Sequence, residues 1–293
     1  MKTKTITRII ASQKVNMGGI ILDQPLPTQG VDQVDPFLLI HHWDDTMPGN
    51  QHQRDVGVGP HPHRGFSPVT FVFEGNVEHN DSLGNRATVH AGGTQWMHAG
   101  LGITHSERPS ASMAQSGGNL EFIQFWVNSP AAHKMDPAYY LPLSDKDTPR
   151  ITTKGAHVAV VAGEYQGIKG PAPTLSPMTL LRGEIQSGSS LMLELPDTFN
   201  TLIYLLDGKG VVNEREAKAK DLIHLSQDGN TVSLQALENT RFIVLSGEPI
   251  DEEVTSYGPF VMNTQTEIME ALRDAQSGKM GILIEEFEST SDL

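Results

Sequence analysis

The chain has 293 residues, of which 38% are hydrophobic and 19% are charged, and its formal net charge is −14. This length and composition suit one large or two medium globular domains, and the acidic charge argues against nucleic-acid binding, which needs clustered Lys and Arg. The chain has no cysteine, so disulfides, zinc–thiolate sites, iron–sulfur clusters and thiol nucleophiles are excluded and any metal must use nitrogen and oxygen ligands.

The N-terminal segment is basic at Lys2, Lys4 and Arg8 but has no apolar core of the length found in signal peptides. No stretch of the chain approaches the roughly 18 consecutive apolar residues that a membrane span needs. We therefore expect a cytoplasmic protein that has no membrane contact, and we expect it to be a monomer.

Short strand-like runs separated by glycine-containing turns fill the first 130 residues. They are rich in β-branched and aromatic residues and lie at 36–41, 69–73, 86–90 and 121–127, with a turn at 81–85. Regular short strands of this kind predict a β-sandwich or β-barrel rather than a helical fold.

The segment 130–154 is rich in Pro, Asp, Lys and Ser, which is typical of a connection between domains. Beyond it, strand signals resume at 157–161, 178–182, 190–195, 200–206, 219–225, 231–234 and 241–245. We therefore predict two domains, residues 1–132 and residues 133–293. The strand ending at Asp207-Gly208 resembles the one ending at Glu74-Gly75, which suggests a duplicated barrel. The second copy has no His-x-His and is expected to have lost any metal site.

One helix is predicted near the C-terminus, over 264–277. Thr264 and Glu267 have the spacing of a capping box, Ile268, Met269 and Leu272 form an apolar stripe, and Gly278 suits the C-terminal end. We expect this helix to cover a barrel and to belong to the second domain. The acidic tail from Glu285 onward is expected to be frayed.

Histidine is concentrated in the first third of the chain, where nine of the 12 lie between His41 and His105. His61 and His63 form one i, i+2 pair, and His105 and Glu107 form another. Residues i and i+2 of a β-strand point to the same face, so two such strands facing each other inside a barrel would aim three imidazoles and one carboxylate at one point. Pro62 removes a backbone donor, which predicts an edge or bulged strand here.

This ligand set predicts a site for one divalent transition metal. Imidazole and carboxylate without sulfur suit Fe(II), Mn(II), Ni(II), Cu(II) or Zn(II), and Fe(II) is favoured because such sites with open positions are typical of non-haem oxygen chemistry. A structural metal without an open position remains an alternative.

The other histidines are given structural roles. His79 is expected on a surface turn, although it could line the pocket mouth. His98 is a candidate for contacting the ligands, and His41 and His42 are expected to be satisfied at a strand end. Arg64 follows the first histidine pair and can either form a buried ion pair or face solvent.

Several motifs occur in an order that resembles the pirin family. They are Asp35 to Leu39, His61 to Phe66, His79 to Asn85, Gln95 to Met97, Ala99 to Glu107, Gln124 to Asn128 and Gly258 to Asn263. The resemblance implies an all-β bicupin, two jelly-roll barrels with one metal in the N-terminal cupin. It also implies that His61, His63, His105 and Glu107 bind a non-haem iron.

The resemblance further implies an activity. Some pirin-like proteins are quercetin 2,3-dioxygenases, which open a flavonol ring with O2 and release CO. By this analogy Glu107 would also be the catalytic base for the flavonol 3-hydroxyl, and Trp96 and Met97 would line the pocket. Ser67 departs from the family, since cupins often have Glu at that position.

A second function class fits the same four ligands. Eukaryotic pirins are described as nuclear cofactors that sense iron redox state and bind transcription regulators, so a metal-bound regulatory module that needs a protein partner and no turnover is the alternative. The sequence has no nuclear-localisation cluster, and we prefer the enzyme.

Overall fold

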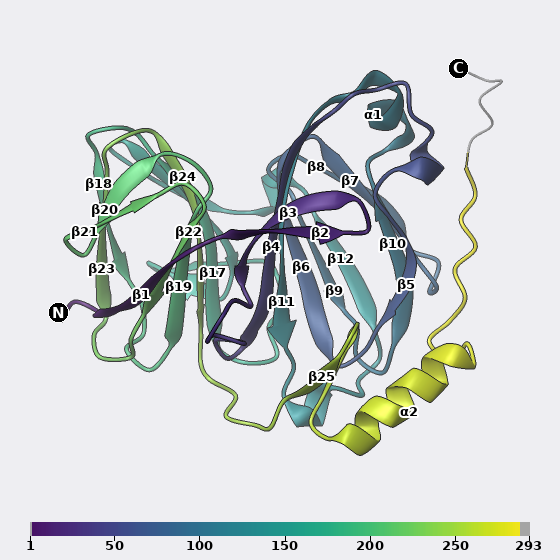
Figure 1. The fold of residues 1–293 in the computed structure, drawn as a ribbon. Coiled ribbons are helices and arrows are strands. Elements are labelled where there is room, and N and C mark those ends of the chain that lie inside the picture. The colour runs from purple at the N-terminus through teal and green to yellow at the C-terminus, as the bar shows by residue number, and fades with distance from the viewer. Residues whose placement is uncertain (1, 288–293) are drawn as a thin grey trace. The chain divides into compact units, whose positions relative to one another are not determined.

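The computed structural model describes residues 2–287. Within them the chain divides into two compact units (Figure 1). Unit 1 takes the described residues of Met1–Val15, Asp23–Leu39 and Asp147–Ile250, and unit 2 takes those of Asn16–Leu22, Ile40–Lys146 and Asp251–Leu293. Each unit is made of three separate segments of the chain, whereas the predicted boundary after residue 132 divides the chain only once. That boundary stays a prediction about sequence domains.

Unit 1 consists of a seven-stranded sheet, a four-stranded sheet and a small hairpin, and the paired strands are antiparallel. The larger sheet has the order β1 (Ile6–Ala11), β22 (Asp221–Leu225), β19 (Asn200–Leu205), β24 (Thr240–Gly247), β17 (Met178–Ile185), β14 (Ala156–Ala162) and β13 (Arg150–Thr153). The smaller sheet has the order β18 (Ser190–Glu194), β23 (Thr231–Ala236), β20 (Lys209–Val212) and β21 (Arg215–Lys218), and the hairpin is β15 (Glu164–Tyr165) with β16 (Ile168–Lys169).

The core of unit 1 is aliphatic and lies between its two sheets. Alternate residues of β18 are buried, so that Leu191 and Leu193 face inward while Met192 faces outward, as period-2 alternation requires. The inward side chains pack against residues of the larger sheet such as Ile203, Leu205 and Val244. The interior of this barrel is therefore filled by hydrocarbon.

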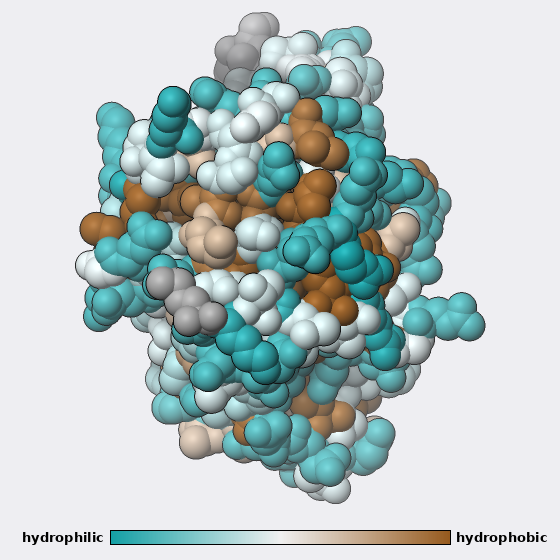
Figure 2. All heavy atoms as spheres, turned by 90° about the vertical axis from the view of Figure 1, so that its left-hand side faces the viewer, coloured by the Kyte–Doolittle hydropathy of each residue, from teal (hydrophilic) through white to brown (hydrophobic). Residues whose placement is uncertain are grey.

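Figure 2 views the side of the molecule that carries the small sheet of unit 1. Brown apolar residues lie among teal hydrophilic ones on this face. Met192 in β18 and Leu237 after β23 are among the exposed apolar residues, at 51% and 41% exposure. The outward positions of these strands are thus mixed in polarity, in contrast to the inward ones.

Unit 2 has the same combination of a four-stranded and a seven-stranded sheet. The smaller sheet has the order β5 (Val58–His63), β10 (Ile103–Arg108), β7 (Asn76–Asp81) and β8 (Arg86–His90). The larger has the order β12 (Tyr139–Leu143), β9 (Thr94–His98), β6 (Phe66–Glu74), β11 (Gly118–Asn128), β4 (Phe37–Met47), β3 (Ile20–Leu26) and β2 (Gln13–Met17). A hairpin of β25 (Thr255–Tyr257) and β26 (Phe260–Met262), the helices α1 (Ala111–Ser116) and α2 (Gln265–Gln276), and the 3-10 turns η1 (Gln53–Asp55), η2 (Ala131–His133) and η3 (Asp145–Asp147) complete the described elements.

The larger sheet of unit 2 has one apolar face and one polar face. Directly paired residues on antiparallel strands point to the same side. Val69 pairs with Phe125 and Phe71 with Ile123, which makes one face apolar, whereas Thr70 pairs with both Gln124 and Gln95 on the other face. This second face brings amide and hydroxyl groups together, and it carries the candidate site described below.

The prediction of an all-β protein with two barrels is confirmed, and the predicted strands are found. The segment 130–154 is more than a connection, because it contains two strands. Strand β12 is part of the larger sheet of unit 2, and β13 is part of the larger sheet of unit 1. Sequence patterning could not show this, since edge strands of four or five residues have little periodicity. The short helix α1 was also missed.

Helix α2 begins and ends close to the predicted residues. The Thr264 side chain accepts from Glu267 N–H while the Glu267 side chain accepts at the cap, which completes the capping box. Gly278 follows the helix with a φ of 73°, a backbone conformation that favours glycine. One expectation is corrected, because Met269 is 58% exposed and Ala271 is buried in its place. In the structure the helix is part of the compact unit 2, and its assignment to the second sequence domain stays a prediction.

No helix in the described residues is long and apolar enough to cross a membrane.

Candidate metal centre

The strands of the small sheet of unit 2 bring the predicted ligands together. On β10, His105 lies directly opposite His61 of β5, and Ile103 lies opposite His63. Strand β5 is the edge of the sheet, and its register with β10 shifts between His105 and Glu107. The prediction that Pro62 marks an edge or bulged strand is confirmed on both counts, because an edge strand needs no ladder donor on its outer side.

Three imidazoles converge as a result. The ring centroids of His61 and His105 are 4.3 Å apart, those of His61 and His63 are 4.8 Å apart, and those of His63 and His105 are 5.0 Å apart. One nitrogen from each ring can be chosen so that the three nitrogens lie within 4.8 Å of one another. His63 and His105 are buried and His61 is half-buried, so the cluster is open on the His61 side.

The hydrogen bonds of these rings determine which nitrogen is free to bind a metal. Nδ1 of His61 lies 2.8 Å from the Gly59 carbonyl, and Nδ1 of His63 lies 3.2 Å from the Pro259 carbonyl. A carbonyl oxygen only accepts, so each Nδ1 carries the proton and each Nε2 keeps its lone pair. Pro259 is almost two hundred positions away in the sequence, so the β25–β26 hairpin orients a predicted ligand from the far end of the chain.

His105 is oriented by a relay through His79. Nε2 of His79 lies 2.9 Å from Oδ2 of Asp81, and its Nδ1 lies 3.4 Å from Nδ1 of His105. The carboxylate accepts from Nε2–H, so Nδ1 of neutral His79 accepts from Nδ1–H of His105. Nε2 of His105 is left buried without a hydrogen-bond partner among the described residues. All three Nε2 atoms therefore present lone pairs, a donor set that fits a divalent transition metal.

The expectation that His79 lies on a surface turn is wrong. Its side chain is fully buried and stacks on Tyr140 with a centroid distance of 3.7 Å and an interplanar angle of 2°. Strand β7 extends to Asp81, so His79 lies within the strand and not in a turn. Its cross-strand partner is Glu107, and the two side chains point to the same inward face. An i, i+2 spacing of His79 and Asp81, similar to the two predicted pairs, was the sequence signal that could have revealed it.

Burial favours the neutral form of the His63 and His105 imidazoles. Desolvation lowers the pKa of His63 well below its usual value of 6.5, and the neighbouring His61 lowers it further. For His105 desolvation again acts most strongly, followed by His61, His63 and His79, and its pKa is also far below 6.5. Neutral imidazole is the form that binds metals.

Glu107 lies on the same inward face but does not join the group of three close nitrogens. Its carboxylate accepts from two glutamine amides. Nε2 of Gln124 lies 3.0 Å from Oε1 and 2.8 Å from Oε2, and Nε2 of Gln95 also donates to Oε1. Sequence reasoning missed both glutamines, because nothing in their spacing shows that β9 and β11 flank β6 with the same face inward.

The apolar side chains beside the histidine cluster differ from the expectation at one position. Trp96 pairs with Val69 and shares the apolar face of the large sheet, away from Thr70 and Gln95. The tryptophan beside the histidines is Trp126, whose ring lies 5.4 Å from His63 and 4.3 Å from Phe66. Met97 packs with Tyr140 on the inner side.

The remaining sequence candidates are accounted for. Arg64 forms an ion pair of 2.9 Å with Asp274 in α2, so the buried alternative is confirmed. His42 is buried and lies 3.1 Å from Oε1 of Glu121, so it is satisfied as expected. It lies inside β4, which continues to Met47, so the expected position at a strand end is wrong. Nδ1 of His98 lies 3.3 Å from the Ser67 hydroxyl, and both side chains lie on the apolar face of the larger sheet. Ser67 therefore does not face the histidine cluster.

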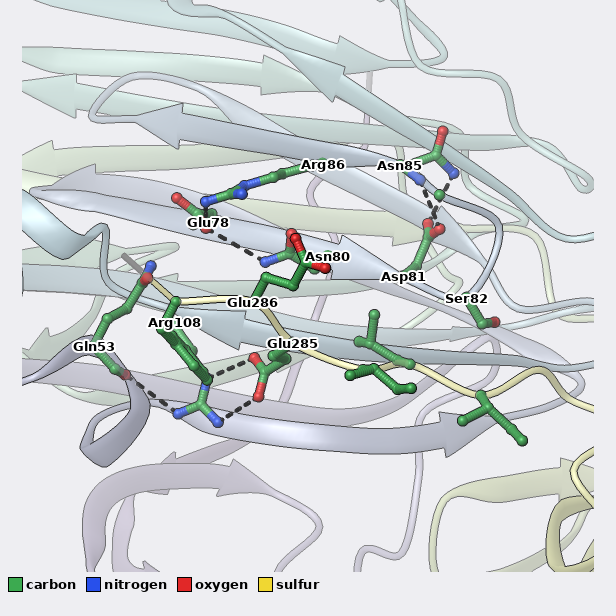
Figure 3. Close-up of a pocket in the computed structure, with 15 residues that line it drawn as sticks. Gln53, Glu78, Asn80, Asp81, Ser82, Asn85, Arg86, Arg108, Glu285 and Glu286 are labelled. Carbon is green, nitrogen blue, oxygen red and sulfur yellow. Dashed lines mark hydrogen bonds and ion pairs between the residues drawn. The ribbon is translucent and has the colours of Figure 1, made fainter. Parts of the chain in front are cut away.

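The C-terminal segment after α2 covers the outer face of the small sheet. On β10, His105 and Glu107 point inward and Arg108 points outward. Its guanidinium donates to both carboxylate oxygens of Glu285, at 2.7 Å and 2.8 Å (Figure 3). The Phe287 ring also lies 5.4 Å from the Arg108 guanidinium. A polar pocket of about 380 Å³ lies between this segment and β7. The expectation that the tail is frayed from Glu285 onward is therefore wrong at Glu285, which Arg108 binds. Residues 288–293 of the predicted tail lie outside the described residues.

Comparison with known proteins gives consistent matches over most of the chain. The family model described as Pirin matches residues 19–127, and the model described as Pirin C-terminal cupin domain matches residues 180–281. A Pseudomonas aeruginosa protein named "Putative quercetin 2,3-dioxygenase PA2418" is 38% identical over 84% of this chain and 86% of its own. A tomato (Solanum lycopersicum) pirin-like protein is 32% identical over 94% of this chain and 92% of its own.

A solved structure extends the likeness to three dimensions. The crystal structure of a quercetin 2,3-dioxygenase from Acinetobacter baumannii has a TM-score of 0.91 to this chain, with 38% sequence identity over 97% of this chain and 100% of that one. The two barrels of this chain are thus the two cupins of a bicupin.

Proposed function

Because the chain belongs to the pirin family, we propose that it is a metal-dependent dioxygenase that opens the ring of a quercetin-like flavonol. One flavonol and one O2 give one ring-opened ester, which keeps both oxygen atoms of O2, and one CO. The observation that carries the proposal is the convergence of three Nε2 lone pairs at one open cluster. The name of the 38% identical Acinetobacter structure supports the substrate class.

The proposed metal ligands are His61, His63, His105 and Glu107. The first three already present lone pairs to a common point, and Glu107 is the next inward residue of β10. We propose Fe(II) as the ion, with Mn(II), Ni(II), Cu(II) and Zn(II) as alternatives that the same nitrogen and oxygen donors accept. When bound, the metal polarises the substrate oxygen and supports the reaction with O2.

The chain's own residues bind the substrate and move one proton. Trp126 and Phe66 offer flat aromatic surfaces beside His63, which suits a planar flavonol. Glu107 lies on the inward face next to the histidine cluster, and its Oε2 has fewer donors than Oε1. We assign it the role of the base that accepts the proton of the flavonol 3-hydroxyl. Deprotonation makes the substrate more electron-rich and ready to react with O2.

The test is turnover by protein reloaded with Fe(II). We expect about one metal per chain, loss of the flavonol absorbance in air, one CO per flavonol consumed, and no reaction under anaerobic conditions. Glu107→Gln should lower kcat by about 100-fold or more, since general-base catalysis contributes roughly 10²–10⁴-fold. One metal per chain without turnover of any flavonol would overturn the proposal in favour of the regulatory alternative.

A further inference from the structure

Two glutamines surround the carboxylate of Glu107. We propose that Gln95 and Gln124 are positioning residues for Glu107, and that their amide groups fix the direction in which its carboxylate presents a lone pair to the metal and the substrate. This inference rests on the proposed function, because it assigns these glutamines a role toward that same site.

The amide of Gln124 is turned by Trp126. The indole Nε1–H of Trp126 lies 3.4 Å from Oε1 of Gln124. An indole nitrogen only donates, so the atom it faces must be the amide oxygen. The NH2 end of Gln124 then points at Glu107, where it lies 2.8 Å from Oε2 and 3.0 Å from Oε1.

The amide of Gln95 lies between Tyr140 and Glu107. A phenol hydroxyl can donate or accept, whereas a carboxylate only accepts, so the NH2 end of Gln95 faces Glu107 and its oxygen faces the Tyr140 hydroxyl. The Tyr140 hydroxyl lies 3.2 Å from Oε1 of Gln95, while Nε2 of Gln95 donates to Oε1 of Glu107. The Tyr140 ring in turn stacks on His79, which orients His105. One aromatic side chain therefore helps to orient both a proposed ligand and the carboxylate next to it.

The contacts are unequal at the two carboxylate oxygens. Oε1 of Glu107 accepts from both glutamines and lies 3.5 Å from the Thr70 hydroxyl, whereas Oε2 accepts from Gln124 alone among the residues that the structure describes. An ionised carboxylate offers about four lone-pair positions. Oε2 is thus the oxygen with capacity left for a metal or a substrate hydroxyl, and the glutamines decide which oxygen that is.

The experiment uses variants that keep shape and remove the donors, Gln124→Met and Gln95→Met, in the full-length protein. Outer contacts of a ligand typically contribute 10–100-fold to metal affinity or activity. We expect the Kd for Ni(II), measured by competition with a chelator, to weaken by roughly that factor, and we expect the visible spectrum of the Co(II)-loaded protein to change. Gln235→Met, an exposed residue of β23 in unit 1, is the matched control and should change neither.

Trp126→Phe and Tyr140→Phe test the orientation itself. Tyr140→Phe keeps its ring and loses the hydroxyl, whereas Trp126→Phe replaces the indole with a smaller aromatic ring that has no N–H donor. We expect each to weaken Ni(II) binding by about 3–10-fold, less than the loss of the amide that it orients. In a double-mutant cycle, Trp126→Phe should add little to Gln124→Met, since the two act through one amide.

Two results would overturn the inference. One is an unchanged Ni(II) Kd and Co(II) spectrum in both methionine variants. The other is a lowered melting temperature of the metal-free protein with no change in Kd, which would mean that the amides only stabilise the fold. These outcomes are independent of flavonol turnover. A protein that fails to consume any flavonol but shows the expected Kd changes would contradict the proposed function and leave the positioning role standing.

Discussion

The two barrels share a framework and differ in what fills them. Each has a seven-stranded and a four-stranded sheet, yet the inward positions of unit 1 are aliphatic while those of unit 2 include histidine, glutamate and glutamine. The described residues contain two groups of potential metal ligands, His61 with His63 and His105, and His42 with Asp44 and Glu121, and both groups lie in unit 2. That the second copy has lost any metal site stays a prediction.

The contrast shows that the framework tolerates both interiors for different physical reasons. In unit 1, Ile203, Leu205 and Leu193 are completely buried and remove apolar surface from water. In unit 2, buried polar groups such as Asp81 and His79 stay satisfied through hydrogen bonds to one another, without which their burial would be costly. We expect the barrel of unit 1 to contribute mainly to stability and the barrel of unit 2 to hold the proposed metal site.

The largest expected effect comes from removing a proposed ligand in unit 2. His105→Ala should lower metal affinity by more than the roughly 10–100-fold typical of outer contacts and abolish turnover. Metal content after dialysis, measured by elemental analysis, should fall from about one per chain to near zero. His224→Ala changes a histidine of unit 1 and is the control. Full metal content in the His105 variant would contradict the ligand assignment.

Truncating a core side chain of unit 1 should lower stability and leave metal content unchanged. Leu193→Ala removes three buried carbon atoms and should lower the free energy of unfolding by about 2–5 kcal/mol, visible as a lower urea midpoint. The volume-conserving Leu193→Met should cost less than about 1.5 kcal/mol. We expect metal content to remain near one per chain in both variants. Loss of the metal in folded Leu193→Ala protein would refute the division of labour between the barrels.

The smallest effect is expected at the ion pair between Arg108 and Glu285, on the outer face of the sheet that carries the histidine cluster. Burial on its own would raise the pKa of Glu285, but its hydrogen bonds and charge interaction with Arg108 outweigh this, and its pKa lies below the usual 4.5. A lowered folded pKa means that the pair stabilises docking of the segment above pH 4.5 and that this contribution is lost as the pH falls through the lower folded value.

Glu285→Gln should therefore reduce hydrogen-exchange protection of residues 280–287 at neutral pH by about 3–10-fold, as expected for the loss of a charge-assisted hydrogen-bonded pair. Below the folded pKa, the variant and the parent should exchange alike. Glu286→Gln, its exposed neighbour, serves as the control. Equal protection of variant and parent at neutral pH would show that the pair does not hold the segment.

Local sequence patterns predicted much of the fold and the two residue pairs that carry the candidate site. Strand runs, glycine turns and the capping box at Thr264 depend on neighbours a few residues apart, and these features are found where predicted. The i, i+2 pairs at His61 and His105 likewise follow from strand geometry alone. Met269 was misplaced because the stripe of α2 depends on what the helix packs against, and sequence periodicity does not reveal that partner.

The sequence by itself determined that this is an all-β protein with its histidines gathered on a few strands, because β-strand alternation and turn chemistry are local. Tertiary structure alone decided which strands pair, and register places His105 between His61 and Asp81. It also decided that His79 is buried, that the Pro259 carbonyl orients His63, and that Gln95 and Gln124 meet at Glu107. Such contacts join residues from about a dozen to nearly two hundred positions apart, and a long-range hydrogen bond leaves no periodic trace in the chain that makes it.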